Sequence, residues 1–314
     1  MAAPGDGTAA LLRGFVMNQI PAVLADGVIY ASWLFLIAAG LTLIYGVMKI
    51  LNMAHGSLYA LGAYAAASLG GAWIAHGHSP YGSYAILIVA AAIAGLAAGV
   101  VIERGLLRFM YGRDEVTLLL ATYALLLILE DLIKLVWGVD PYFFAEPYGL
   151  LGTLEFGNLI YPTYDLLLLA IALLIGGAMS WILRSTRSGK LLRVVIHDRE
   201  VSVAMGINVG RFYLTTFTAG AILATIGGAV TAPMISVVPG MGVEVIVLAF
   251  AVVVIGGLGS LPGAALGALI VGITRAAAVH YLPEAELFSV YLVMAIVLIF
   301  RPKGLFSGAE VRKI

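Results

Sequence analysis

Long apolar runs, separated by short polar segments, repeat along almost the whole chain. Each run is close to the roughly 20 residues that an α-helix needs to cross a hydrocarbon core of about 30 Å. Lipid offers exposed peptide groups no hydrogen-bond partners, so spanning segments must be helices, and the alternating pattern of a β-barrel strand is absent. Nine spans are predicted, near residues 27–47, 50–73, 83–102, 116–137, 164–183, 212–233, 243–257, 261–280 and 286–300.

The span count has one open alternative. The seventh and eighth spans are short and are joined by a glycine-rich segment at residues 257–263, so eight full crossings plus broken elements is nearly as good an interpretation. The predicted fold class is an all-α polytopic membrane protein with eight or nine transmembrane helices, some of them broken or short. The expected parts are an N-terminal segment 1–26, a membrane domain 27–300 and a tail 301–314.

Composition supports a membrane protein and excludes several other classes. Hydrophobic residues make up 62% of the 314 residues and charged residues 11%, with a mean hydropathy of +1.06. The 38 glycines favour close helix–helix packing. Basic and acidic residues balance at 17 each, which gives no indication of nucleic-acid binding, and the lack of cysteine excludes disulfides and thiolate metal sites. The first 26 residues, with Arg13 as their single basic residue, lack a signal peptide's charged start and are expected to be a mature N-terminus.

Basic residues predict the orientation, because cytoplasmic loops of membrane proteins are enriched in Lys and Arg. They cluster after the third span, after the fifth span and in the tail, and these three segments share one side if all nine spans cross. Residues 138–163, on the other side, contain acidic residues and no Lys or Arg. We therefore expect a multi-pass protein of the bacterial inner membrane with a cytoplasmic C-terminus. The basic residues of these three segments are Arg104, Arg108, Arg113, Arg184, Arg187, Lys190, Arg193, Arg199, Arg211, Arg301, Lys303, Arg312 and Lys313.

Two interrupted segments stand out from otherwise featureless spans. Polar residues open the second span, and glycines with a proline lie between the seventh and eighth. Polar groups within apolar spans are costly unless they face a partner or a watery cavity, and broken spans in the two halves of a transporter point to its substrate pathway. The alternative is that the glycines only permit tight packing. The candidate translocation-pathway residues are Asn52, His55, Gly56, Gly256, Gly257, Gly259, Ser260 and Pro262.

The loop at residues 184–211 contains signals for a short helix. Asp198 is a suitable N-cap, Glu200 suits the first turn and Gly206 suits the C-terminal end, so a helix is predicted at 199–205. Such a helix with apolar residues on the cytoplasmic side needs a surface to cover it. A partner subunit would do so; packing on the membrane or on the chain's own loops is the alternative.

Charges inside the spans are few. Glu130, Asp131 and Lys134 fall near the outer end of the fourth span, where Glu130 and Lys134 would meet one helical turn apart and neutralise each other. A contact with a partner or a polar vestibule is the alternative for this group. Arg275 lies toward the outer end of the eighth span, where its side chain could extend to the interface or meet an anionic group of a substrate.

Several motifs are absent. The phosphate-binding G-x-x-x-x-G-K-[ST] loop does not occur, so ATP must be bound elsewhere, and no metalloprotease or hydrolase motif is present. The histidines show no ligand spacing beyond His76 and His78, for which a solvated loop is the simpler interpretation. We therefore expect a transport subunit rather than an enzyme, with no catalytic residues, no metal and no cofactor of its own.

The chain resembles the branched-chain amino-acid ABC importer permeases of the LivH type along nearly its whole length. The resemblance rests on five segments in order: 40–46 (GLTLIYG), 52–56 (NMAHG), Glu103 and Arg104 with Arg108, 252–264 (VVVIGGLGSLPGA) and 301–305 (RPKGL). It implies the ABC importer permease fold. It also implies transport of branched-chain amino acids or a related small solute by alternating access, although the solute itself is not determined by the sequence.

The resemblance also implies partners. They are a second related permease subunit, two ATPase subunits that use the ATP, and an extracytoplasmic substrate-binding protein, with membrane lipid around the complex. In ABC importers a cytoplasmic loop of the permease docks into the ATPase, and the loop 184–211 has the spacing for it, with Val201 and Ser202 where two alanines are usual. The ATPase-docking residues implied are Asp198, Glu200, Ala204, Gly206 and Asn208.

An ion-gradient-driven secondary transporter or channel is the alternative function. It would need carboxylates near the centre of the membrane to carry the coupling ion, and none is convincingly placed there by the sequence. It also gives no role to the loop 184–211. A membrane-embedded enzyme would need a cluster of His, Asp or Ser on facing spans, and the sequence indicates none.

Overall fold

The computed structural model describes residues 6–157, 159–197 and 199–306, and helices dominate that part of the chain. Among the described residues, eight helices are long and apolar enough to cross a membrane, and a shorter apolar helix, α11, has 16 residues. All nine predicted spans therefore correspond to helices. These nine helices are α1 (Asp6–Met48), α2 (His55–Ala75), α3 (Ser83–Ile102), α5 (Glu115–Trp137), α7 (Thr163–Ser185), α10 (Val209–Thr231), the shorter α11 (Met241–Gly256), α12 (Leu261–Tyr281) and α13 (Glu286–Phe300).

The shorter elements lie in the connections. After α3 the chain forms a π-helical turn (Glu103–Leu107) and α4 (Arg108–Met110); α6 (Glu146–Gly149) and a small hairpin precede α7. The hairpin pairs β1 (Thr153–Phe156) with β2 (Leu159–Pro162) in antiparallel register, Thr153 opposite Pro162. Two helices, α8 (Arg187–His197) and α9 (Arg199–Ala204), fill the long loop before α10. The hairpin is an exception to the all-helical expectation.

Helix α1 begins much earlier than the first predicted span. It runs without interruption from Asp6 to Met48 and includes Pro21, so the boundary expected between residues 26 and 27 falls inside a helix. Its second half is the most buried part of the bundle, where it packs along α12, α10, α7 and α11. Helices α7 and α13, by contrast, present most of their side chains to the outside of the bundle.

Close approach between helices is made possible by small residues. Gly62 of α2 packs against the backbone of Thr225 in α10, and Gly228 of α10 packs against the backbone of Tyr59 in α2. Between these contacts the Tyr59 hydroxyl lies 2.5 Å from the Thr231 hydroxyl and accepts a hydrogen bond from the Trp33 indole at 3.1 Å. The glycine content thus serves helix packing, as the composition predicts.

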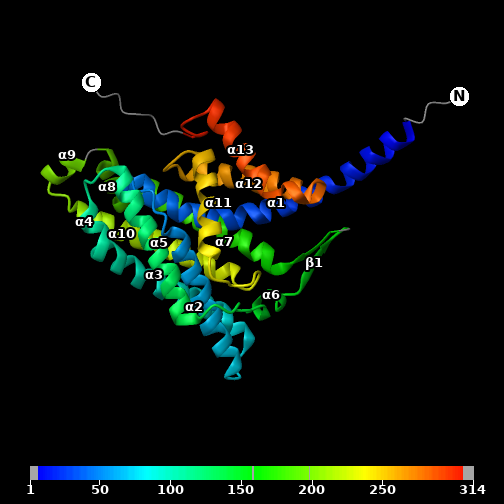
Figure 1. The fold of residues 1–314 in the computed structure, drawn as a ribbon, viewed down its shortest axis with the longest axis horizontal. Coiled ribbons are helices and arrows are strands. Elements are labelled where there is room, and N and C mark those ends of the chain that lie inside the picture. The colour runs from blue at the N-terminus through cyan, green and yellow to red at the C-terminus, as the bar shows by residue number, and fades with distance from the viewer. Residues whose placement is uncertain (1–5, 158, 198, 307–314) are drawn as a thin grey trace.

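The three basic segments gather at one end of the bundle, which we call the basic end. The ring of Tyr111, after α4, lies 4.9 Å from the ring of Tyr213 at the start of α10, and both side chains pack in one cluster with Met48. The tail lies there too, because Leu305 N–H donates to the Ile255 carbonyl at 2.9 Å, beside the end of α1. Figure 1 shows α4, α8 and α9 together at one end of the long axis and the hairpin at the other. The structure thus brings the three basic segments to one end of the bundle.

Helix α11 is too short to cross a membrane as a helix alone. At 16 residues it spans about 24 Å, less than a hydrocarbon core. The non-helical segment 232–240 covers the remainder, entering the bundle from the end opposite the basic end, where Val237 pairs with Tyr142. Among the described residues, eight helices are thus long enough to cross a membrane, and the short helix α11 follows a coil, which corresponds to the alternative of eight full crossings plus broken elements.

Candidate translocation site

Helix α2 begins inside the bundle rather than at its surface. After α1 ends at Met48, Lys49 adopts a φ of 56°, the only positive φ of a non-glycine residue in the described chain, and residues 49–54 return into the bundle. A Cβ on Gly40 of α1 would lie 2.9 Å from the His55 ring. Gly40 precedes Met48 by about two turns, or about 12 Å along the helix. The first residue of α2 thus lies deep within the bundle.

The threonine Thr122 of α5 satisfies the backbone of this entering segment. Its hydroxyl donates to the Leu51 carbonyl at 3.0 Å and accepts from the Met53 N–H at 3.3 Å. Backbone groups at membrane depth are tolerated only where protein or water satisfies them. One buried hydroxyl therefore satisfies two backbone groups of a non-helical segment inside the bundle.

Asn52 and His55 are both completely buried. His55 Nε2 lies 3.1 Å from the Ile37 carbonyl, while its Nδ1 has no hydrogen-bond partner among the described residues. The Asn52 backbone carbonyl accepts from the His55 N–H at 3.2 Å, but neither side-chain atom of Asn52 has a partner in the described chain. Buried polar atoms are nearly always hydrogen-bonded. The side chains of Asn52 and His55 therefore have donor and acceptor atoms that could bind a further group.

The start of α11 meets the start of α2. Gly56 and Gly242 pack backbone against backbone, and a Cβ on Gly242 would lie 2.7 Å from the Gly56 carbonyl oxygen. Glu130 of α5 lies at the same point, where its Oε2 accepts from the Gly240 N–H at 3.0 Å. Two helix N-termini and one carboxylate are thus brought together inside the bundle, which matches the preference of helix N-termini for negative charge.

The expected pairing of Glu130 with Lys134 is wrong. Lys134 instead pairs with Asp131 at 3.1 Å on the exposed face of α5, while Glu130 is 5% exposed. The reason is that Glu130 faces the start of α11, where a backbone donor replaces the lysine. Glu130 lies about two turns before the end of α5, as expected, and also at the meeting point of the starts of α2 and α11.

The glycine-rich junction lies elsewhere, at the basic end. Gly257 (φ 108°) packs against the backbone of Phe306, and Gly259 (φ 80°) against Gly46 near the end of α1. Ser260 caps α12, accepting from the Gly263 N–H at 3.1 Å. The structure therefore joins Asn52, His55 and Gly56 to residues 240–242, and it separates them from the junction 256–262, whose glycines allow close backbone packing. Gly256 packs in the same way against Gly263.

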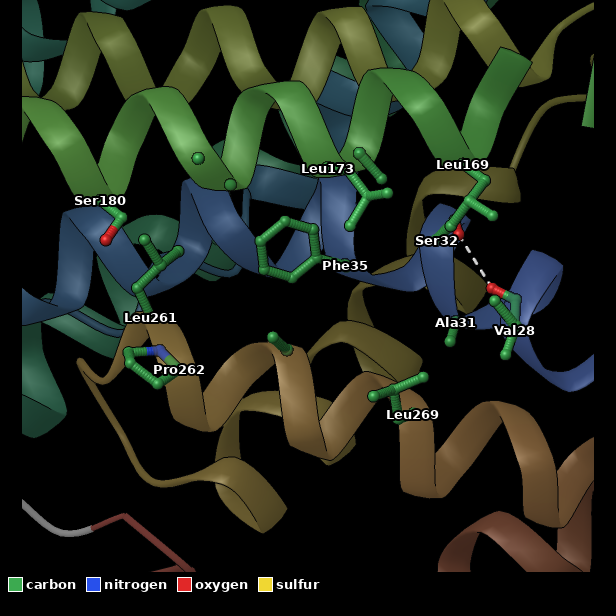
Figure 2. Close-up of a pocket in the computed structure, with 14 residues that line it drawn as sticks. Val28, Ala31, Ser32, Phe35, Leu169, Leu173, Ser180, Leu261, Pro262 and Leu269 are labelled. Atoms are coloured by element: carbon green, nitrogen blue, oxygen red, sulfur yellow. Dashed lines mark hydrogen bonds between the residues drawn. The ribbon is translucent and has the colours of Figure 1, made fainter. Parts of the chain in front are cut away.

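An apolar groove runs between α1, α7 and α12 (Figure 2), and Pro262 is the predicted pathway residue that lines it. The groove has a volume of about 320 Å³. Phe35 lies in its middle, and Leu261 and Leu173 close it from α12 and α7. The Ser32 hydroxyl is occupied by the Val28 carbonyl at 2.8 Å. With no charged group in its lining, this groove is suited to apolar atoms and not to a zwitterion.

A larger cavity, which we call the vestibule, lies between α1, α7, α11, α12 and α13 away from the basic end. Its volume is about 990 Å³. The lining combines apolar side chains of α11 with charged and aromatic ones from the other helices. The charged and aromatic members are Asp26, Tyr30, Trp33, Tyr161, Asp165, Glu244, Arg275, His280, Glu286 and Tyr291.

Most charges of the vestibule are paired with one another. Arg275 forms an ion pair with Glu286 and lies over the Tyr30 ring, 3.9 Å from its centroid. Asp26 accepts from Tyr161 at 2.8 Å and lies 2.7 Å from His280 Nε2. Arg275 thus has an anionic and an aromatic partner on the vestibule wall, which answers the question that the sequence left open for this residue.

The tyrosine hydroxyls that meet these carboxylates stay protonated at neutral pH. Burial, followed by the hydrogen bond to Asp26, raises the pKa of Tyr161 in the hairpin to about 12. Burial, together with the nearby Asp165, raises the pKa of Tyr148 to about 12. Both hydroxyls are therefore donors, Tyr161 to Asp26 and Tyr148 to Asp165 at 3.4 Å.

The predicted helix at 199–205 is confirmed as α9, Arg199–Ala204. It ends as expected, because Gly206 adopts a φ of 77° and Ile207 N–H donates to the Ser202 carbonyl at 3.0 Å. Asn208 then caps α10, its side chain accepting from the Arg211 N–H at 3.0 Å. The preceding basic stretch forms α8, which the sequence analysis did not anticipate.

Helix α9 exposes apolar side chains at the basic end. Val201, Val203 and Met205 are 49%, 58% and 69% exposed, and Ala204 is exposed beside them. Ser202 is completely buried on the other side. Of the other predicted docking residues, Asp198 lies outside the described residues and Glu200 lies in α9 by its backbone. The exposed set Val201, Val203, Ala204 and Met205, which we call the α9 surface, is an apolar patch beside basic loops.

The sequence analysis missed several residues of these sites, among them Thr122, Asp165 and Gly240. Thr122 could have been found, because it is a polar residue within an apolar span. Asp165, in the first turn of α7, carries a similar signal. Gly240 acts through its backbone N–H, and no sequence signal distinguishes it from the other glycines.

Residues 23–300 match the sequence model of a family described as the branched-chain amino acid transport system permease component. The chain belongs to this family. It is similar to LivH of Salmonella typhimurium, a high-affinity branched-chain amino acid transport system permease protein, with 28% identity over 92% of this chain and 96% of LivH. BraD of Pseudomonas aeruginosa, with the same description, is 28% identical over 93% of this chain and 97% of BraD. The probable LivH of Methanocaldococcus jannaschii is 30% identical over 93% and 94%.

A solved structure shares the fold. PsaBC from Streptococcus pneumoniae in complex with Fab superposes with a TM-score of 0.50 at 13% identity, over 92% of this chain and 94% of that one. The LivH-type resemblance and the expected polytopic permease fold are confirmed by these matches. This family member is a membrane-spanning permease component of a transport system.

Proposed function

We propose that the chain is a permease subunit of an ATP-driven importer for branched-chain amino acids. It would form half of the translocation pathway with a second related permease, receive solute from an extracytoplasmic binding protein and couple to two separate ATPase subunits. The family match over residues 23–300 carries this proposal, since the members named above serve branched-chain amino acid transport systems. ATP would be used by the partner subunits alone.

The basic end would face the cytoplasm, because positively charged loops favour that side. The α9 surface lies at this end and would dock on an ATPase subunit, as Val203 and Met205 are more exposed than apolar side chains usually are without a partner. Gly206 and Asn208 would fix the exit of α9 and the start of α10, so that a movement of α9 reaches α10 directly. ATP-driven movement would thereby enter the bundle through its most buried helices.

The pathway would include the point where α2 and α11 begin. Helices that start inside a membrane protein present N–H groups to the solute path in many transporters. The unpartnered side chains of Asn52 and His55 lie at this point and would gain partners when the bundle rearranges. Gly256, Gly257, Gly259, Ser260 and Pro262 would act at the basic end as the flexible connection between α11 and α12.

Co-purification with the ATPase subunits tests the proposal. The variant carrying Val203→Asp and Met205→Asp would place two carboxylates on the α9 surface, and we expect it to lose the ATPase subunits and ATP-driven leucine uptake in proteoliposomes. Arg113→Gln, an exposed change at the same end, is the matched control and should keep both. Leucine uptake by the wild-type chain without any ATPase would overturn the assignment in favour of a secondary transporter.

A further inference from the structure

We propose that the vestibule is a binding site for a zwitterionic amino acid, in which Asp165 binds the α-ammonium group and Arg275 the α-carboxylate. This inference rests on the proposed function and adds to it a specific solute-recognition site on the permease itself. Four carboxylates, one arginine and one histidine line the vestibule.

The pairing of these charges leaves an excess of negative charge. Glu286 is paired with Arg275, and Asp26 is held by His280 and Tyr161. Asp165 and Glu244 remain without a basic partner in the described chain. A cavity with unpaired carboxylates favours a cationic group, and an ammonium group supplies the charge together with hydrogen-bond donors.

Asp165 is the carboxylate placed to bind such a group. It is only 7% exposed, yet its Oδ1 has no hydrogen-bond partner among the described residues and its side chain lines the vestibule. Its other oxygen accepts from Tyr148 at a long 3.4 Å. A buried carboxylate oxygen without a donor is costly, so a solute ammonium group in the vestibule would complete its hydrogen bonding.

Arg275 supplies the opposite charge at a suitable place. Its Nε is buried without a partner among the described residues, although its terminal nitrogen meets Glu286. The arginine lies over Tyr30, one turn from Asp26 on α1 and therefore about 6 Å along the helix. Tyr161 donates to Asp26, and Tyr148 donates to Asp165 on the adjacent α7. Arg275, Asp26 and Asp165 all line the vestibule, so the positive and the negative groups face the same cavity.

The remaining wall suits an apolar side chain. Val245 and Leu248 of α11 and Leu168 of α7 line the same cavity. A volume of about 990 Å³ accommodates an amino acid together with water. The apolar groove of Figure 2 offers no charged group for either end of a zwitterion, which singles out the vestibule of these two cavities.

Thermal unfolding of the permease–ATPase complex, without the binding protein, tests the site directly. A ligand that binds the folded state raises Tm with its concentration. We expect L-leucine to raise the Tm of the wild-type complex and 4-methylpentanoate, which lacks the ammonium group, to have no effect at equal concentration. Asp165→Asn should raise the dissociation constant for leucine about tenfold or more, because it removes a charge-assisted hydrogen bond.

Two further variants separate binding from structure. Tyr148→Phe removes the hydrogen bond on Asp165 but keeps the carboxylate, and it should retain the leucine-dependent shift. Asp131→Asn, an exposed carboxylate outside the vestibule, should behave as wild type. A full leucine shift in Asp165→Asn, or an equal loss in Tyr148→Phe, would overturn the proposal.

ATP-driven leucine uptake in proteoliposomes with the binding protein distinguishes the two levels of inference. If the wild-type complex takes up leucine while Asp165→Asn does so with an unchanged KM, the vestibule site is wrong and the importer assignment stands. If the wild-type complex takes up no leucine, the assignment as a leucine importer is wrong, and the vestibule proposal, which rests on it, is wrong with it. We expect uptake by the wild type and an increased KM in the variant.

Discussion

Glu130 of α5 accepts a hydrogen bond at 3.0 Å from the backbone N–H of Gly240, directly before the first residue of α11. A helix that begins inside a bundle has N–H groups that water does not reach, and here a side chain from a different helix supplies one acceptor. The same carboxylate lies against Gly242, which touches Gly56 at the start of α2. One acidic residue thus fixes the relative position of three helices.

Glu130→Ala should lower the stability of the bundle. The change leaves the Gly240 N–H without its acceptor, at a cost of about 1–3 kcal/mol. Thermal unfolding in detergent, followed by intrinsic fluorescence, measures the effect as a lower Tm. Asp131→Ala is the matched control, because its pair with Lys134 is exposed and should contribute less than about 1 kcal/mol. Equal Tm values for the two variants would contradict this role of Glu130.

Gly56→Ala should destabilise the meeting point of α2 and α11. The new methyl group would collide with the Gly242 carbonyl, and both backbones would have to separate at a cost of about 1–3 kcal/mol. Gly71→Ala in the same helix is the control, since nothing lies within 4 Å of its Cβ position. That change should be neutral or should stabilise by up to about 1 kcal/mol. A Tm for Gly56→Ala at or above that of Gly71→Ala would refute the close contact.

Truncation after Lys303 should weaken the junction between α11 and α12. It removes the hydrogen bonds from Leu305 N–H to the Ile255 carbonyl and from Phe306 N–H to the Gly256 carbonyl, both 2.9 Å. Limited proteolysis should then cut faster near Gly257. A chain truncated after Phe306 keeps both bonds and should resist cleavage as the full chain does. Identical cleavage rates for the two truncations would show that the tail does not protect the junction.

Asp114 should stabilise the start of α5 in a pH-dependent way. Hydrogen bonds from the Thr117 hydroxyl and N–H hold the pKa of this carboxyl below its ordinary value. Its stabilising effect is therefore complete above the ordinary carboxyl pKa and is lost as the pH falls through the lowered one. The Tm difference between wild type and Asp114→Ala should be constant near neutral pH and should shrink below about pH 4. A difference that grows on acidification would contradict the sign.

The positions of the helices were largely predictable, because hydropathy reports which segments contact lipid. All nine apolar runs are helices, and the short helix α9 was marked by Gly206 and its preceding polar residues. Helix starts inside the bundle were less predictable. Ile50 and Leu51 are apolar but not helical, since Thr122 satisfies the backbone there and hydropathy does not register such long-range hydrogen bonds. The candidate pathway residues lie at the start of α2 and at the end of α11 opposite to its contact with α2, and their role in transport stays a prediction.

The vestibule could not be predicted for a related reason. Asp26, Asp165 and Arg275 belong to three separate helices, and each has a simple explanation as an isolated residue near a helix end. Their shared cavity depends on how α1, α7 and α12 pack. The sequence identified Arg275 as unusual, but its partners Glu286 and Tyr30 emerge only when the helices are placed side by side.

The attachment of the tail to α11 also bears on how the protein is made. Ribosomes synthesise the chain from its N-terminus, and Ile255 and Gly256 leave the ribosome before α12, α13 and the residues that will bond to them. During synthesis the end of α11 therefore has carbonyl groups that only Leu305 and Phe306, among the last described residues, will satisfy. These two hydrogen bonds form only after every helix has been synthesised, so a chain that stops before Leu305 leaves the junction open.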